Sequence, residues 1–129
     1  MLIVDSSVWI DFFAGRPHAH VQRLDAALLS DGDIGVPDIV RLEVLSGVRD
    51  DAALRKITTN FNALQRLSAR DADWDEAAGL YRLCKQKGIT VRSVVDCLIA
   101  QLAMREAGTL LANDRDFDLM ARHCALRLA

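Results

Sequence analysis

Short apolar segments that alternate with longer amphipathic segments constrain this chain more than any other feature of its sequence. In the longer segments, the apolar side chains recur with the period of a helix. Strands that alternate with helices favour a parallel sheet with helices on both faces. The 129 residues contain no linker or repeat, so we expect one domain over residues 1–129. The expected strands are Leu2–Val4, Ile34–Val36, a short strand near Leu67, Thr109–Ala112 and Ala125–Leu128.

Small polar residues and glycines mark the ends of the expected helices. A Ser or Asp before an apolar-periodic segment caps a helix, and a Gly after it stops the helix. Ser6 or Ser7 therefore begins the first helix, which ends before Gly15. We expect the later helices over about Val21–Ser30, Asp38–Gly47, Asp51–Leu64, Asp71–Gly88, Ser93–Gly108 and Asp116–Arg122. Asp38 caps the second of these, Asp71 or Asp73 the fourth, and Ser93 the fifth.

Composition limits the class of protein without naming a substrate. Hydrophobic residues make up 51% of the chain, a share that suggests a surface covered by a partner. The net charge of −2 neither favours nor excludes nucleic acid, because 13 of the 16 basic residues are Arg, which binds phosphate well. Three cysteines without a CxxC spacing indicate neither disulfides nor a zinc site. We expect a cytoplasmic protein with no signal peptide and no membrane span.

Four acidic residues, two at the ends of expected strands and two on helix turns, could converge on one site. Asp5 and Asp114 each follow a predicted strand, and ligands bind beyond the carboxyl ends of such strands. Glu43 and Asp96 lie on helix turns among apolar residues. Carboxylates that converge repel one another, and a hard divalent cation such as Mg²⁺ or Mn²⁺ relieves that repulsion. Such ions can activate a water and hold a phosphodiester for hydrolysis.

Each acid also has a purely structural interpretation. Asp5 and Asp114 are good helix caps, and Glu43 fits a solvated helix position. Asp96 follows Ser93 by three residues, which is the spacing of a capping box. Taken singly, the structural and functional interpretations are equally good. Two histidines in the Gly/Pro-containing loop near residue 18, His18 and His20, are expected to be solvated.

Four segments, in order, resemble the PIN-domain toxins of the VapC family. They are LIVDSSVWIDFF at the start, RLEVLSG around Glu43, RSVVDCLIAQLA around Asp96 and LLANDRDFDLMA around Asp114. The resemblance covers essentially the whole chain. It implies an α/β/α sandwich with a five-stranded parallel sheet, and a Mg²⁺- or Mn²⁺-dependent endoribonuclease that uses a metal-activated water.

The same resemblance assigns roles to individual residues. Asp5, Glu43, Asp96 and Asp114 match the catalytic acids, and Asp116 matches an additional acid of the last motif. Asp5, Asp96, Asp114 and Asp116 are the expected metal ligands. Ser7 matches a hydroxyl residue that supports the first Asp. Arg92 and Arg115, beside and inside the last two motifs, are candidates for binding RNA phosphates.

The resemblance also implies partners. VapC-like toxins pair with a VapB-like antitoxin, form homodimers or toxin–antitoxin hetero-oligomers, and cleave structured RNA, chiefly tRNA or ribosomal RNA. An apolar surplus and an acidic pocket suit an antitoxin that brings an apolar helix and a basic side chain.

Two other functions fit parts of the pattern. A phospho-acceptor domain also places Asp at strand ends, but it needs a Lys late in the chain, and the last Lys here is Lys87. A PIN-like module that binds RNA or protein without catalysis is the alternative to an enzyme, and it would be favoured if an acid were missing. A nuclease acting on DNA shares the same chemistry.

Overall fold

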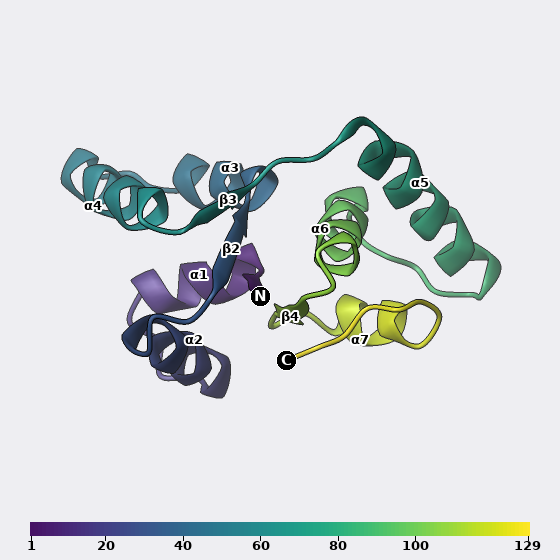
Figure 1. The fold of residues 1–129 in the computed structure, drawn as a ribbon, viewed down its shortest axis with the longest axis horizontal. Helices are drawn as coiled ribbons and strands as arrows, with labels where there is room; N and C mark the ends of the chain where they lie inside the picture. The colour runs from purple at the N-terminus through teal and green to yellow at the C-terminus, as the bar shows by residue number, and fades with distance from the viewer.

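The computed structural model describes residues 1–129 and contains four strands and seven helices (Figure 1). Strands and helices alternate along most of the chain, as the sequence predicts. In chain order they are β1 (Leu2–Val4), α1 (Ser6–Phe13), α2 (Ala19–Leu29), β2 (Ile34–Pro37), α3 (Asp38–Ser46), α4 (Asp51–Asn62), β3 (Gln65–Leu67), α5 (Asp71–Gln86), α6 (Val94–Arg105), β4 (Thr109–Leu111) and α7 (Arg115–Ala121).

The strands form one parallel sheet in the order β3-β2-β1-β4. Successive residues of a strand point to opposite faces of a sheet. Ile3 and Val4 of β1 are both fully buried, and Leu110 and Leu111 of β4 are nearly so. Both faces of the sheet are therefore covered, which confirms the predicted parallel sheet between layers of helices.

The prediction of a fifth strand over Ala125–Leu128 is wrong. Only Leu128 pairs with the sheet, through an isolated parallel bridge to Leu110. The N–H of Leu110 donates to the Arg127 carbonyl at 2.9 Å, and its carbonyl accepts the N–H of Ala129 at 2.9 Å. Alternate residues of a strand direct their backbone groups to opposite edges, so three-residue β4 offers only Leu110 on its outer edge. A fifth strand would need further outward-facing backbone groups on β4 for its hydrogen bonds, and β4 has none.

Two helix caps differ from the sequence prediction. The cap of α1 is Asp5, because its Oδ2 accepts the N–H of Ser7 at 3.1 Å. This confirms the structural interpretation of Asp5 as a helix cap, and neither Ser6 nor Ser7 takes that position. The cap of α3 is Pro37, and Asp38 is the first helical residue. The Asp38 carboxylate instead accepts a hydrogen bond from the hydroxyl of Ser68, so it ties α3 to the segment after β3.

The boundaries of α5 and α6 also depart from expectation. The cap of α5 is Arg70, whose N–H donates to the Asp73 carboxylate at 2.7 Å. After α6, the left-handed residue is Ala107 (φ 50°) rather than Gly108. Gly108 serves a different need, since a Cβ there would lie 2.8 Å from the carbonyl oxygen of Met1. A residue without a side chain lets β4 approach the beginning of β1.

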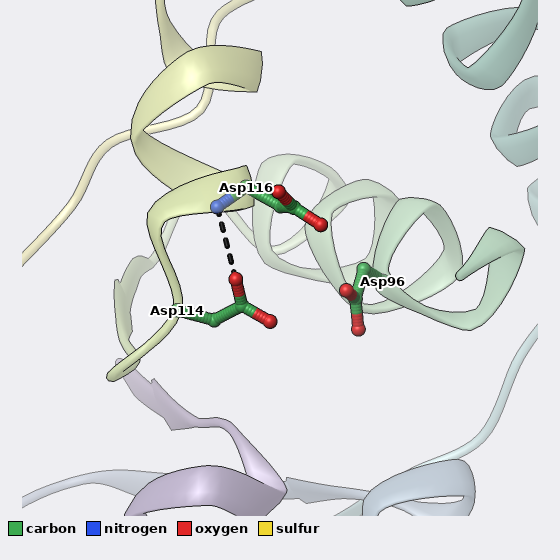
Figure 2. A group of neighbouring side chains, drawn as sticks. All are labelled: Asp96, Asp114 and Asp116. Atoms are coloured by element: carbon green, nitrogen blue, oxygen red, sulfur yellow. Dashed lines mark hydrogen bonds between the residues drawn. The ribbon is translucent and has the colours of Figure 1, made fainter. Parts of the chain in front are cut away.

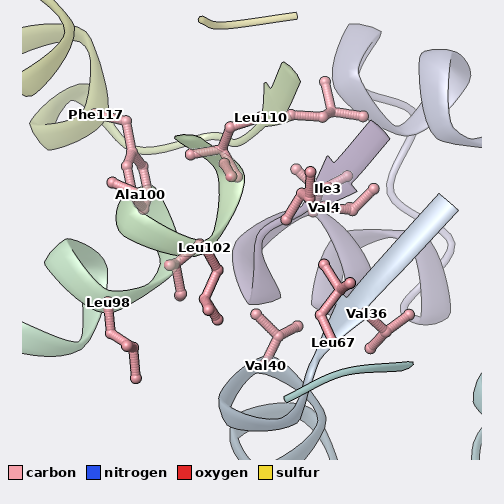
Figure 3. Close-up of a cluster of buried hydrophobic side chains, with 14 of the residues drawn as sticks. Ile3, Val4, Val36, Val40, Leu67, Leu98, Ala100, Leu102, Leu110 and Phe117 are labelled. Carbon is pink, nitrogen blue, oxygen red and sulfur yellow. The ribbon is translucent and has the colours of Figure 1, made fainter. Parts of the chain in front are cut away.

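A single apolar core joins the sheet to the helices (Figure 3). The helix α6 is its main component, with six buried residues that include Leu98 and Leu102. Trp9 of α1 and Phe117 of α7 are each 1% exposed. Because α6 and α7 pack through this core, the acids at their N-termini are held on rigid elements. No helix of the structure is long and apolar enough to span a membrane.

The strand order also fixes where a site can form. The chain leaves β1 toward β2 and β3, and then crosses back to β4 on the other side of β1. The connections that follow β1 and β4 therefore diverge at the carboxyl ends of two adjacent strands. Open α/β sheets bind ligands at such a switch point. Asp5 and Asp114 come from these two connections.

Candidate metal centre

Three aspartates from two helices form the centre of the site (Figure 2). Asp96 lies in the first turn of α6, Asp114 caps α7, and Asp116 lies in the first turn of α7. One carboxylate oxygen from each lies within 4.8 Å of the others. The N–H of Asp116 donates to Asp114 Oδ1 at 3.0 Å, which fixes the orientation of that carboxylate.

The structural interpretation of Asp96 as part of a capping box is wrong. The cap of α6 is Ser93, whose Oγ accepts the N–H of Val95 at 3.2 Å. The reciprocal bond from the Ser93 backbone to the Asp96 carboxylate is not formed. Asp96 is half-buried among the neighbouring acids, so capping does not explain its position. Asp114 differs, because it is at once a helix cap and a member of the cluster.

Asp5 adds a nearly buried carboxylate from the end of β1. It is 4% exposed, and its Oδ2 accepts hydrogen bonds from the N–H and the hydroxyl of Ser7, at 3.1 and 2.5 Å. The same hydroxyl accepts the N–H of Asn113 at 3.1 Å, so Ser7 links Asp5 to the segment that follows β4. The other oxygen, Asp5 Oδ1, is buried and has no hydrogen-bond partner.

Glu43 on α3 supplies a second unpaired oxygen. The side chain is half-buried, and its Oε1 is buried without a partner. Burial raises the pKa of Glu43, and the charge of Asp5 raises it further. Asp5 and Glu43 lie outside the tight group of three oxygens, but they are close enough for their charges to act on each other.

The mutual repulsion of the acids is strongest at Asp96. Burial, followed by the charges of Asp5, Asp114, Glu43 and Asp116, raises the pKa of Asp96 to about 7. Burial also raises the pKa of Asp5, against the hydrogen bonds from Ser7 that lower it. A raised pKa means that the protein alone does not fully stabilise the charged form. The structure thus brings all four predicted catalytic acids and Asp116 into one electrostatically coupled group.

The two arginines predicted near the site behave differently. Arg92 forms ion pairs with Asp114 (2.7 Å from Nη2 to Oδ1) and with Asp116 (3.2 Å from Nε to Oδ2). Its backbone N–H also donates to Asp116 Oδ2 at 3.1 Å. Arg115 is exposed, and the structure gives it no ion pair. Sequence reasoning placed Arg92 near the acids but did not foresee that it pairs with them.

The donor set fits a hard divalent cation. All five groups are carboxylates, and two of their buried oxygens lack any hydrogen-bond donor. A buried anionic oxygen without a partner is costly unless a cation or a proton satisfies it. Mg²⁺ and Mn²⁺ prefer oxygen ligands, whereas zinc is usually held by nitrogen or sulfur. The three cysteines lie outside the metal-competent group.

One polar cluster outside the site escaped the sequence analysis. His20 was expected to be solvated, but its Nε2 lies 2.7 Å from Oδ2 of the nearly buried Asp11. Arg16 Nη1 donates to Asp11 Oδ1 at 2.6 Å, and this bond, with that from His20, lowers the pKa of Asp11. His18 is exposed, as predicted. The cluster joins α1 to the start of α2 and has a structural role.

Comparison with known proteins agrees with this geometry. The family model described as PIN domain matches residues 2–123. The chain is 36% identical over 133 aligned residues to the ribonuclease VapC11 of Mycobacterium tuberculosis, covering 100% of this chain and 98% of that protein. Similarity at this level, over the full length, indicates a shared family rather than a shared fold alone.

Two solved structures share the fold at low sequence identity. VapBC2 from Rickettsia felis, bound to a DNA fragment from its promoter, superposes with a TM-score of 0.79 and 19% identity, covering 99% of this chain and 96% of that one. VapC20 of Mycobacterium tuberculosis, a toxin that cleaves the sarcin-ricin loop, gives a TM-score of 0.65 and 12% identity, covering 95% of both chains.

Proposed function

The chain belongs to the PIN-domain family as a VapC-type ribonuclease, and we propose that it is a Mg²⁺- or Mn²⁺-dependent endoribonuclease toxin that cleaves structured RNA. The observation that carries this proposal is the group of five coupled carboxylates with two buried, unpaired oxygens. Such an arrangement is unfavourable for folding, and a divalent cation relieves it.

The proposed metal ligands are Asp5, Asp96, Asp114 and Asp116, with Glu43 acting beside them. A bound divalent cation supplies an activated water and neutralises charge on a phosphodiester during hydrolysis. Ser7 holds Asp5 Oδ2 through its hydroxyl, which leaves Asp5 Oδ1 without a hydrogen-bond partner and available to a cation.

Arg92 and Arg115 are the proposed phosphate-binding residues. Both are exposed, and both lie on segments that also carry acids of the site. Guanidinium groups bind phosphate in a bidentate fork. We propose tRNA or ribosomal RNA as the substrate class. VapC20, which shares the fold, is described as cleaving a structured RNA element, the sarcin-ricin loop.

The proposed partner is a VapB-like antitoxin in the cytoplasm. An apolar groove between α3, α5 and α6, with a volume of about 420 Å³, offers a helix a docking surface. Exposed apolar residues line it, among them Trp74 and Val94, which are 57% and 62% exposed. The cluster of carboxylates suits a basic side chain from the same partner. We propose that the chain forms a homodimer or a toxin–antitoxin hetero-oligomer, and the exposed apolar groove supports a protein partner.

The test is cleavage of total cellular RNA by the purified protein, freed of any partner. Mg²⁺ is present or removed by chelation, and Asp96→Asn is compared with Asp50→Asn. Asp50 is a matched control because it is an exposed helix cap, a position that Asn also occupies well.

We expect cleavage at discrete sites by the wild type and by Asp50→Asn, and loss of cleavage with chelator or with Asp96→Asn. Equal cleavage by the wild type and Asp96→Asn would refute the proposed site. RNA binding without cleavage by any variant, at any Mg²⁺ concentration, would favour a non-catalytic module.

A further inference from the structure

Arg92 is the one cation that pairs with the acids of the site. Its guanidinium bridges Asp114 and Asp116, the two acids of α7 that belong to the metal-competent group. Asp96, the third member of that group, forms no ion pair with it. The guanidinium thus partly neutralises the site from one side, where a divalent cation would otherwise do so.

The two halves of Arg92 are attached very differently. The backbone N–H is fixed to Asp116 Oδ2 at 3.1 Å, and this bond orders the segment between α5 and α6. The side chain, in contrast, is 70% exposed and reaches the acids from the surface. The acids are less exposed, at 23% for Asp114 and 6% for Asp116, so solvent weakens these ion pairs mainly from the arginine side. The guanidinium can therefore leave the acids without any movement of the backbone.

A positive charge held on these carboxylates opposes a divalent cation in two ways. It occupies Asp114 Oδ1, which already accepts the N–H of Asp116 at 3.0 Å, so that a metal has only the second oxygen of Asp114 as a free ligand. It also repels a second cation a few ångströms away. Both effects weaken metal binding, and neither of them requires RNA.

We propose that Arg92 is a resident counter-cation of the metal centre, one whose charge competes with a divalent metal for Asp114 and Asp116 and weakens its binding until the guanidinium leaves. The proposal deepens the proposed function and rests on it, since it assigns the competing ligand of the same site. A displaced guanidinium is then available to a phosphate of the substrate, which joins this role to the phosphate-binding role proposed above.

The first test measures Mn²⁺ binding to the full chain by calorimetry, without RNA. Arg92→Gln is compared with Arg23→Gln, which removes the same charge from an exposed position on α2, away from α6 and α7 (Figure 1). We expect Arg92→Gln to bind Mn²⁺ about two- to five-fold more tightly than the wild type, in line with the strength of exposed ion pairs. Arg23→Gln should match the wild type.

Unchanged or weaker Mn²⁺ binding by Arg92→Gln would overturn the proposal. Weaker binding would mean that Arg92 positions the two aspartates for the metal instead of competing with it. If the wild type binds Mn²⁺ and cleaves RNA but Arg92→Gln gains nothing, this inference fails alone. If the wild type neither binds Mn²⁺ nor cleaves RNA, the proposed function fails with it.

A second measurement uses the wild type only and follows arginine Nε–H resonances by NMR during a Mg²⁺ titration. The Arg92 Nε–H resonance should move and saturate together with metal binding. Arg105 is the internal reference, because its Nε donates to Asp73 at 3.2 Å in an ion pair that is only 15% exposed on the arginine side. An Arg92 resonance that stays fixed while Mg²⁺ binds would also overturn the proposal.

Discussion

Replacing Asp96 by Asn should stabilise the metal-free protein while abolishing its activity. In the folded chain, burial and four neighbouring acids raise the pKa of Asp96 to about 7 from its ordinary value of 3.8. Between about pH 4 and pH 7 the folded state therefore binds more protons than the unfolded state. The free energy of unfolding then falls as the pH rises through this range, and stays low above about pH 7.

The size of the effect follows from the same pKa difference. At 1.36 kcal/mol per pKa unit, the rise from 3.8 to about 7 corresponds to about 4 kcal/mol. Asp96 is only half-buried, so solvent screens part of this repulsion, and we expect about 1–2 kcal/mol. Asn has nearly the same shape and no charge, so at pH 8 the variant should gain that amount.

The assay is urea denaturation at pH 4 and pH 8, with chelator and with Mg²⁺. With chelator, Asp96→Asn should match the wild type near pH 4 and exceed it by about 1–2 kcal/mol at pH 8. With Mg²⁺, the wild type should recover stability through binding, and the variant should not. A variant that is less stable than the wild type at pH 8 in chelator would refute the electrostatic reasoning.

Three further predictions test other parts of the structure. Protons compete with the metal at Asp96, so Mn²⁺ binding should be about tenfold weaker at pH 6 than at pH 8, and binding should release a proton from the protein. An affinity that calorimetry finds independent of pH would contradict this. Ser7→Ala removes the 2.5 Å hydrogen bond to Asp5, so kcat should fall about tenfold and the free energy of unfolding should fall by about 1 kcal/mol. An unchanged kcat would exclude a supporting role for Ser7. Phe117→Ala should lower the free energy of unfolding by about 3–5 kcal/mol in urea, because Phe117 is 1% exposed; a loss below about 1 kcal/mol would contradict its place in the core.

The sequence predicted the parts of the site that depend on local signals. An apolar strand followed by an acid places Asp5 and Asp114 at the same sheet edge, because parallel strands share their carboxyl ends. The apolar run around Asp96 predicts a helix position close to buried surface, and in the structure the side chain is half-buried. Glu43 was a candidate only because it lies among apolar residues on a helix, a weak signal that the four-motif resemblance strengthened.

The features that the sequence missed depend on contacts between distant residues. Arg92 lies 22 and 24 positions before its two partners, so nothing in its neighbourhood indicates an ion pair. The fifth strand failed because pairing depends on which backbone groups β4 offers, and composition does not show this. Asp11 and His20 are nine residues apart across a helix end, beyond the reach of periodicity.

The central claim is that one cluster of carboxylates holds the metal that the ribonuclease uses. Anomalous diffraction from crystals of the partner-free protein soaked in Mn²⁺ tests it most directly. We predict an anomalous peak among Asp5, Asp96, Asp114 and Asp116, with carboxylate oxygens at about 2.0–2.4 Å from the ion. A cluster that stays empty at a Mn²⁺ concentration that supports RNA cleavage, or a peak bound elsewhere on the chain, would contradict the account.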